Sequence, residues 1–89
     1  MRHTIWKTRC ERDLKRMIRR GKDREKFLDV ARLIANDGYL VQEYRPHKLS
    51  GKYAGCWECH IESDWLLIYG VTEKKVLLAR TGTHADLFE

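Results

Sequence analysis

The sequence predicts a single α+β domain over residues 1–89, in which an N-terminal strand and a helical hairpin pack on a small antiparallel β-sheet. Three observations support this fold class. Apolar residues recur at helical spacing between residues 10 and 34, and three short runs of strand-forming residues follow between residues 56 and 81. The segments between those runs are too short for crossovers, so the strands must form an antiparallel meander.

The helical hairpin follows a short strand predicted at residues 3–7. The stripe of the first helix is made of Cys10, Leu14, Met17 and Ile18. Gly21 ends this run, and Asp23 is suited to the N-cap of the second helix. The stripe of that helix is made of Phe27, Val30, Ala31 and Ile34. Gly38 is suited to the left-handed position that closes it.

The sheet is predicted from strands at residues 56–61, 65–71 and 76–81, after a loop over residues 39–55 that contains Pro46. If residues 62–63 and 73–74 are the turns, His60 lies opposite Trp65, and Leu67 lies opposite Arg80. The face left open by the helices would then carry Glu58, His60, Trp65, Leu67, Tyr69 and Arg80. A one-residue bulge in either hairpin would change this register.

The positive charge is concentrated in the first third of the chain. The net charge is +5, yet residues 2–26 carry eleven Lys and Arg against four Asp and Glu. A local basic surface of this kind favours a polyanionic partner, most simply nucleic acid, although a solvated helix face would give the same pattern.

The remaining composition indicates a soluble protein with reduced thiols. The first residues lead directly into a charged stretch and do not resemble a signal peptide. The longest apolar run, residues 65–71, is far short of a membrane span. We therefore expect a cytoplasmic protein without a membrane partner, whose three cysteines do not form a disulfide framework.

Polar residues near the predicted strand ends supply the groups needed for metal-independent RNA cleavage. That reaction requires a base for the 2′-hydroxyl proton, an acid for the leaving 5′-oxygen and a cation for the phosphate. Histidine suits the first two roles near neutral pH, and arginine suits the third. The candidates are His47, His60, Asp64, His84 and Arg80, with Trp65 and Phe88 as stacking platforms for bases. Each of them also has an ordinary structural role as an alternative.

Two patterns in the sequence are alternatives to this chemistry, one for haem attachment and one for a metal site. Covalent haem attachment uses the spacing seen in Cys56-Trp57-Glu58-Cys59-His60, but two residues three apart on a strand point to opposite faces. A zinc site could use His47, His60, Asp64 and His84, although none of them has the close spacing of a recognisable metal motif. We expect neither a cofactor nor a metal.

Three segments resemble the YafQ branch of the RelE superfamily, toxins of type II toxin–antitoxin modules. They are His47-Lys48-Leu49-Ser50-Gly51, the strand end His60-Ile61-Glu62-Ser63-Asp64-Trp65, and the closing Arg80-Thr81-Gly82-Thr83-His84-Ala85-Asp86-Leu87-Phe88. The resemblance covers essentially the whole chain. Lys48 and Ser63 depart from it, because proline is common at both positions in the relatives.

The resemblance implies a RelE-like fold and a ribosome-dependent endoribonuclease that cuts mRNA in the A site. It implies catalytic roles for His47, His60, Asp64 and His84. We expect His84 to be the general acid, with His47 or His60 and Asp64 activating the 2′-hydroxyl. Arg80, Trp65 and Phe88 would bind RNA or stabilise the phosphate. The expected partners are mRNA, ribosomal RNA and a cognate antitoxin in a hetero-oligomer. The alternative is a ParE-like toxin of the same fold, which inhibits gyrase by binding and needs no proton-transfer groups.

Overall fold

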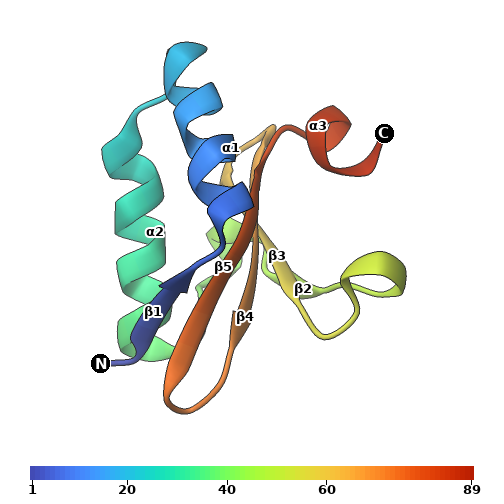
Figure 1. The fold of residues 1–89 in the computed structure, drawn as a ribbon. Coiled ribbons are helices and arrows are strands. Elements are labelled where there is room, and N and C mark those ends of the chain that lie inside the picture. The colour runs from blue at the N-terminus through green and yellow to red at the C-terminus, as the bar shows by residue number, and fades with distance from the viewer.

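A five-stranded sheet with helices on both faces makes up the computed structural model, which describes residues 1–89 (Figure 1). In chain order the elements are β1 (His3–Trp6), α1 (Thr8–Arg19), α2 (Arg24–Asp37), β2 (His47–Lys48), β3 (Trp57–Glu62), β4 (Trp65–Val71), β5 (Lys75–Gly82) and α3 (His84–Phe88). The strand order is β1-β5-β4-β3-β2, with β1 parallel to β5 and the other pairs antiparallel. The predicted α+β fold with a β3–β4–β5 meander is confirmed.

The two long helices pack side by side on one face of the sheet, as the sequence predicts (Figure 1). Asp23 caps α2 by accepting a hydrogen bond from the Glu25 amide at 2.9 Å. Gly38 closes α2 with φ of 77°, in the left-handed region that glycine adopts at little cost. The apolar stripes of both helices are buried except at Ile18, which is partly exposed. No helix combines the length and apolar character needed to cross a bilayer.

The predicted strand register is wrong by one residue in both hairpins. His60 lies opposite Leu66, and Leu67 lies opposite Thr81. The first turn is Ser63-Asp64, one residue later than predicted, and each hairpin also contains one extra residue, Ile61 in β3 and Ala79 in β5. Because side chains alternate with a period of two, each bulge moves the following residues to the other face.

In the observed register, three residues that were predicted to lie on the open face point to the other face and are buried. They are Trp65, Leu67 and Tyr69, which join the core under α1 and α2. The Trp65 ring lies 6.5 Å from the ring of Phe27, which in turn stacks on Trp6 at 5.4 Å. Trp65 donates its indole N–H to the Thr81 hydroxyl at 2.9 Å, so the polar end of the ring is satisfied inside the core.

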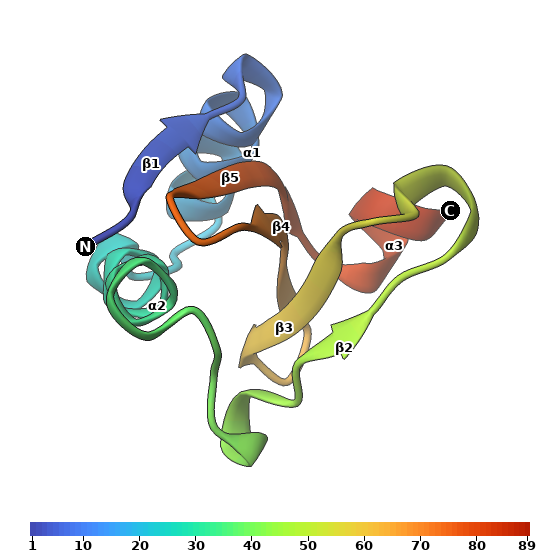
Figure 2. The same cartoon turned by 90° about the horizontal axis from the view of Figure 1, so that it is seen from below.

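The second face of the sheet is covered by α3 and by the segment that precedes β3 (Figure 2). Leu87 of α3 packs on Leu66 and Ile68 of β4, and Leu49 and Tyr53 pack beside them. The segment predicted as a loop contains β2 and two 3₁₀ turns, Gln42–Tyr44 and Gly51–Tyr53. A two-residue strand has no periodicity to detect, yet β2 places His47 opposite Glu58 of β3.

Candidate functional site

Two histidines converge on one glutamate at the β2–β3 edge. The Nε2 atoms of His47 and His60 lie 3.3 and 3.8 Å from the same carboxylate oxygen, Oε1 of Glu58. Glu58 is only 7% exposed, because β2 covers one side of it and Ile68 of β4 lies opposite. At these distances the carboxylate attracts either imidazole when the ring is protonated, and it holds both rings at one point of the sheet edge.

The other ring nitrogen of His60 has two competing partners. Its Nδ1 atom lies 3.1 Å from the guanidinium of Arg45 and 3.2 Å from the carbonyl oxygen of Ser63. A protonated Nδ1 donates to Ser63, whereas an unprotonated Nδ1 accepts from Arg45. Both arrangements keep the ring in place.

Arg80 is held by a buried carboxylate from α1. Its Nε and Nη2 atoms donate to Asp13 at 2.7 and 3.2 Å, and its Nη1 atom donates to the Tyr53 hydroxyl at 3.3 Å. Asp13 also accepts the Thr81 amide hydrogen at 3.2 Å. The hydrogen bond to Asp13 raises the pKa of Arg80 further above its ordinary value. The guanidinium is therefore permanently charged and fixed in orientation.

The short helix α3 presents His84 at the protein surface. The His84 amide donates to Oδ1 of Asp64 at 2.9 Å, which ties the start of α3 to the β3–β4 hairpin. Thr83 and Asp86 form a capping box, each side chain accepting the other residue's backbone N–H. The imidazole of His84 lies 5.0 Å from the ring of Phe88, one helical turn away. His84 is exposed, so a bound ligand could reach its ring.

An ion pair fastens α3 to α1. Arg20 donates to both carboxylate oxygens of Asp86 at 2.7 and 3.3 Å, and Arg16 lies 3.9 Å from the same carboxylate. The bond from Arg20 holds the pKa of Asp86 far below its ordinary range. A Cβ atom at Gly82 would lie 3.0 Å from the Asp86 side chain, so a larger residue there would push Asp86 away from its present position.

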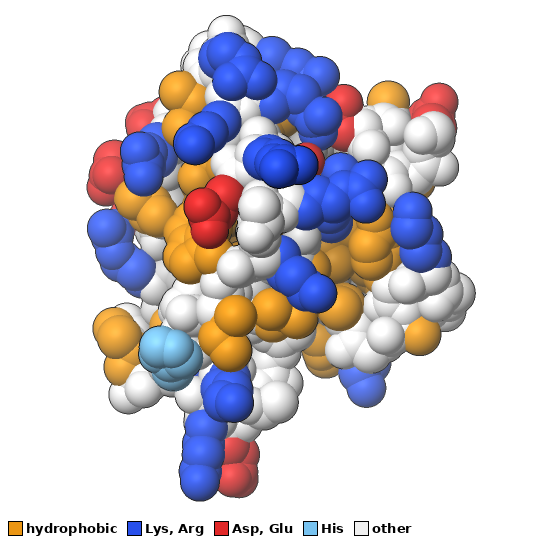
Figure 3. Space-filling model, viewed as in Figure 1, with side chains coloured by type: hydrophobic (Ala, Val, Ile, Leu, Met, Phe, Trp, Pro, Cys, Tyr) orange, Lys and Arg blue, Asp and Glu red, His pale blue; other side chains and the backbone are white.

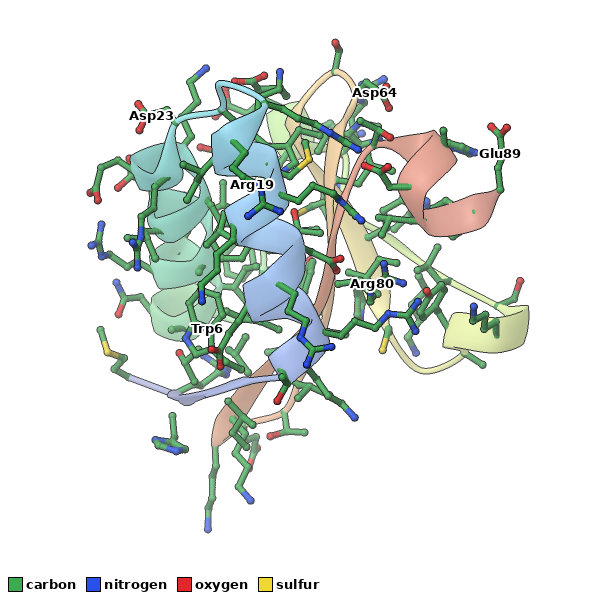
Figure 4. The ribbon with its side chains drawn as sticks, turned by 45° about the horizontal axis from the view of Figure 1, so that its top comes forward. Trp6, Arg19, Asp23, Asp64, Arg80 and Glu89 are labelled. Atoms are coloured by element: carbon green, nitrogen blue, oxygen red, sulfur yellow. The ribbon has the colours of Figure 1, made fainter.

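The predicted site residues fall into two groups on the same side of the sheet, with Trp65 outside both. The first group is His47 and His60, which meet at Glu58. The second group is Arg80, Phe88 and His84, which are connected by Tyr53. The Tyr53 hydroxyl contacts Arg80, and its ring lies 6.0 Å from the ring of Phe88. Figure 4 shows Arg80 inside the fold, Asp64 at the hairpin tip near α3, and Glu89 beyond that helix. Trp65 is 0% exposed, and its ring is not available for stacking on RNA.

Three residues of this region were not predicted as site residues, and two of them left a signal in the sequence. Asp13 falls between Cys10 and Leu14 on the apolar stripe of α1, where a charged residue needs a buried partner. Glu58 alternates with His60 on one strand, and the predicted shared face includes both. Tyr53 lies in an irregular segment, and nothing in the pattern marks it.

The cysteine pattern does not provide the geometry for covalent haem attachment. The Cys59 side chain is fully buried in the core, and burial raises the pKa of its thiol to about 12. Cys56 lies on the other face, among the residues that pack against Leu66, Ile68 and Leu87. The two sulfur atoms therefore face opposite sides of the sheet, as the strand alternation predicts.

Basic side chains gather over α1, on the surface that Figure 3 shows. The exposed members on this helix are Arg9, Arg12, Lys15 and Arg19, and Arg20 follows directly. Arg16 and Arg20 connect this surface to α3 through Asp86. The basic surface is therefore continuous with the helix that carries His84.

Comparisons with known proteins agree on one family. Residues 2–89 match the family described as "Bacterial toxin of type II toxin-antitoxin system, YafQ". The mRNA interferase toxin YafQ of Escherichia coli K12 is 40% identical over 78 residues, which is 86% of this chain and 85% of that protein. The fold is similar to YafQ in the E. coli DinJ–YafQ complex, with a TM-score of 0.90, 34% identity and full coverage of both chains. A metal-bound toxin from Helicobacter pylori gives a TM-score of 0.88 at 30% identity, covering 99% of this chain and 100% of that one.

Proposed function

Because the chain belongs to the YafQ family of bacterial toxins of type II toxin–antitoxin systems, we propose that it is an endoribonuclease that cleaves mRNA in the ribosomal A site and so inhibits translation. The arrangement of His47 and His60 on Glu58, on the same side of the sheet as Arg80 and His84, is the observation that carries this proposal. It supplies proton-transfer groups and a fixed cation, which a toxin acting by binding alone does not require.

The proposed reaction is attack of the 2′-hydroxyl oxygen on the adjacent phosphorus. His60 or His47 removes the hydroxyl proton, the bond from phosphorus to the 5′-oxygen breaks, and His84 donates a proton to that oxygen. The products are a 2′,3′-cyclic phosphate and a free 5′-hydroxyl. Arg80 stabilises the charge on the phosphate, and Asp64 positions His84 through its backbone amide. No metal takes part.

The proposed partners follow from the charged surface and from the relatives. The basic residues of α1 bind phosphates of ribosomal RNA, so ribosome affinity falls as salt rises. The complex formed by DinJ and the related YafQ supports a cognate antitoxin that forms a hetero-oligomer with this chain. The substrate and the ribosome place its action in the cytoplasm.

The test is primer extension on a defined mRNA with purified ribosomes, with wild type compared to His84→Gln. General acid catalysis contributes roughly 10²- to 10⁴-fold, and the variant should lose about that factor in cleavage rate. His3→Gln is the matched control, because His3 is exposed on β1 at the opposite edge of the sheet.

Two outcomes would contradict the proposal. Wild type that leaves the mRNA intact on active ribosomes would remove the nuclease activity, and inhibition of gyrase supercoiling would then favour the ParE-like alternative. Full activity of His84→Gln would remove His84 from the acid role while leaving the nuclease in place.

A further inference from the structure

A hollow of about 320 Å³ lies beside the proposed site and has no role in the reaction described above. It is lined by Ser50, Lys52, Tyr53, Leu87, Phe88 and Glu89. One wall comes from the 3₁₀ turn after β2, and the other comes from the end of α3. Pockets that hold whole drug-sized ligands start at about 300 Å³, so a single nucleobase fits in this space.

The hollow adjoins the residues proposed to handle the scissile phosphate. The Tyr53 hydroxyl accepts a hydrogen bond from Nη1 of Arg80 at 3.3 Å. On the opposite wall, the Phe88 ring lies 5.0 Å from the imidazole of His84. A nucleotide whose phosphate lies at Arg80 and His84 would therefore place a neighbouring base within reach of the hollow.

The walls of the hollow include two aromatic rings that are partly open to solvent, Tyr53 and Phe88. Tyr53 and Phe88 lie edge to face, with centroids 6.0 Å apart and ring planes at 88°. Phe88 is 40% exposed, and the ammonium group of Lys52 lies 5.5 Å from the centre of the Tyr53 ring. A base that enters can stack on one ring and meet the edge of the other. Unstacked RNA bases are commonly bound on exposed aromatic rings next to cationic groups.

The carboxylate of Glu89 can make this surface discriminate between nucleobases. Glu89 lines the hollow and is exposed, and a carboxylate can only accept hydrogen bonds. Guanine presents two adjacent donors on its Watson–Crick edge, its N1–H and its amino group, which match the two oxygens of a carboxylate. Adenine and cytosine present an amino group, whereas uracil has no amino group and presents a single N3–H between two carbonyl oxygens, which repel a carboxylate.

We propose that this hollow is a nucleobase subsite for the nucleotide beside the scissile phosphate, and that Glu89 makes it prefer amino-bearing bases, guanine above all, over uracil. The inference rests on the proposed function and adds a basis for sequence preference to it. Stacking on Tyr53 and Phe88 supplies affinity for any base, and Glu89 supplies the discrimination.

The first test measures binding without ribosomes, by NMR titration of the isolated protein with the four nucleoside 5′-monophosphates. All four carry the same phosphate, so differences between them report the base. We expect GMP to shift the signals of Tyr53, Phe88 and Glu89 and to bind roughly tenfold more tightly than UMP. Glu89→Gln should remove most of this ratio, because an amide can also donate to the uracil carbonyls. Glu73→Gln, in the β4–β5 turn, is the matched control.

A second pair of variants tests the stacking wall. Tyr53→Leu should weaken binding of all four nucleotides, whereas Tyr53→Phe keeps the ring and should not. The third measurement is ribosomal cleavage of messages that differ only in the A-site codon, where Glu89→Gln should raise cleavage next to uracil relative to guanine.

The outcomes separate this inference from the proposed function. Equal affinity for GMP and UMP, or shifts confined to other residues, would overturn the subsite even if the protein cleaves mRNA. Base discrimination that Glu89→Gln abolishes would support the subsite even if the ribosome assay showed no cleavage.

Discussion

Asp13→Asn should destabilise the fold strongly, although it only replaces one carboxylate oxygen with an NH₂ group and lies away from the histidines. Asp13 is 4% exposed, and its carboxylate accepts hydrogen bonds from Arg80 and from the Thr81 amide. The asparagine keeps one acceptor oxygen but turns an NH₂ group toward these donors. It also leaves the Arg80 charge, itself 7% exposed, without a counter-ion.

The magnitude follows from the burial of both partners. Breaking a buried ion pair by removing one partner costs about 3–5 kcal/mol. At about 0.05–0.15 kcal/mol per residue, a domain of this length has a free energy of unfolding of roughly 4–13 kcal/mol. The variant should therefore lose a large part of its stability. In a domain of this size, each kcal/mol lowers Tm by about 4–8 °C, so a fall of at least 12 °C or so is expected.

Urea unfolding followed by tryptophan fluorescence measures this loss, with an unchanged dependence on urea showing that the native state is intact. Asp29→Asn is the matched control, because the Asp29 carboxylate pairs with Arg32 at 3.0 Å while both side chains are more than half exposed. That pair should contribute less than about 1 kcal/mol. If Asp13→Asn also lowers the free energy of unfolding by less than about 1 kcal/mol, the buried Asp13–Arg80 pair does not stabilise the fold as its burial implies.

Two further predictions concern α3 and the thiols. The pKa of Asp86 is lower in the folded protein than in the unfolded chain, where it is about 4. The charged carboxylate therefore raises the free energy of unfolding at pH values above about 4, and this contribution is lost as the pH falls below that value. The stability advantage of wild type over Asp86→Asn should thus be constant near neutral pH and shrink in acid unfolding curves. Burial raises the pKa of Cys10 and Cys59 to about 12, so mass spectrometry after native iodoacetamide treatment should find only Cys56 modified; rapid labelling of all three would contradict the core packing.

The sequence was sufficient for elements whose signals are local. The periodicity of α1 and α2, the cap at Asp23 and the glycine at 38 each depend on a few neighbouring residues, and all were predicted correctly. The meander also followed from local information, because connections this short exclude parallel pairing. The strand β1 was predicted as a strand, although its parallel pairing with β5 was not specified.

Features that depend on tertiary geometry were missed. Ile61 and Ala79 are ordinary strand residues, and only the assembled hairpins show them to be bulges that move Trp65 into the core. The pairing of Asp13 with Arg80 joins residues 67 positions apart, and no local pattern reports such a distance. The sequence therefore identified which residues are candidates for the site, whereas the structure was needed to identify the residues that they contact.

The parallel pairing of β1 with β5 has a consequence for how the protein is made. His3 pairs with Lys75, so the first strand has no partner until nearly the whole chain has been synthesised. Contacts between such distant segments form late, because chain closure must precede them. Arg80 and His84 lie in the same final stretch, and the buried partner of Arg80 comes from α1 near the start. A growing chain thus lacks both the completed sheet and the groups proposed to act on RNA until residues 75–84 have been synthesised.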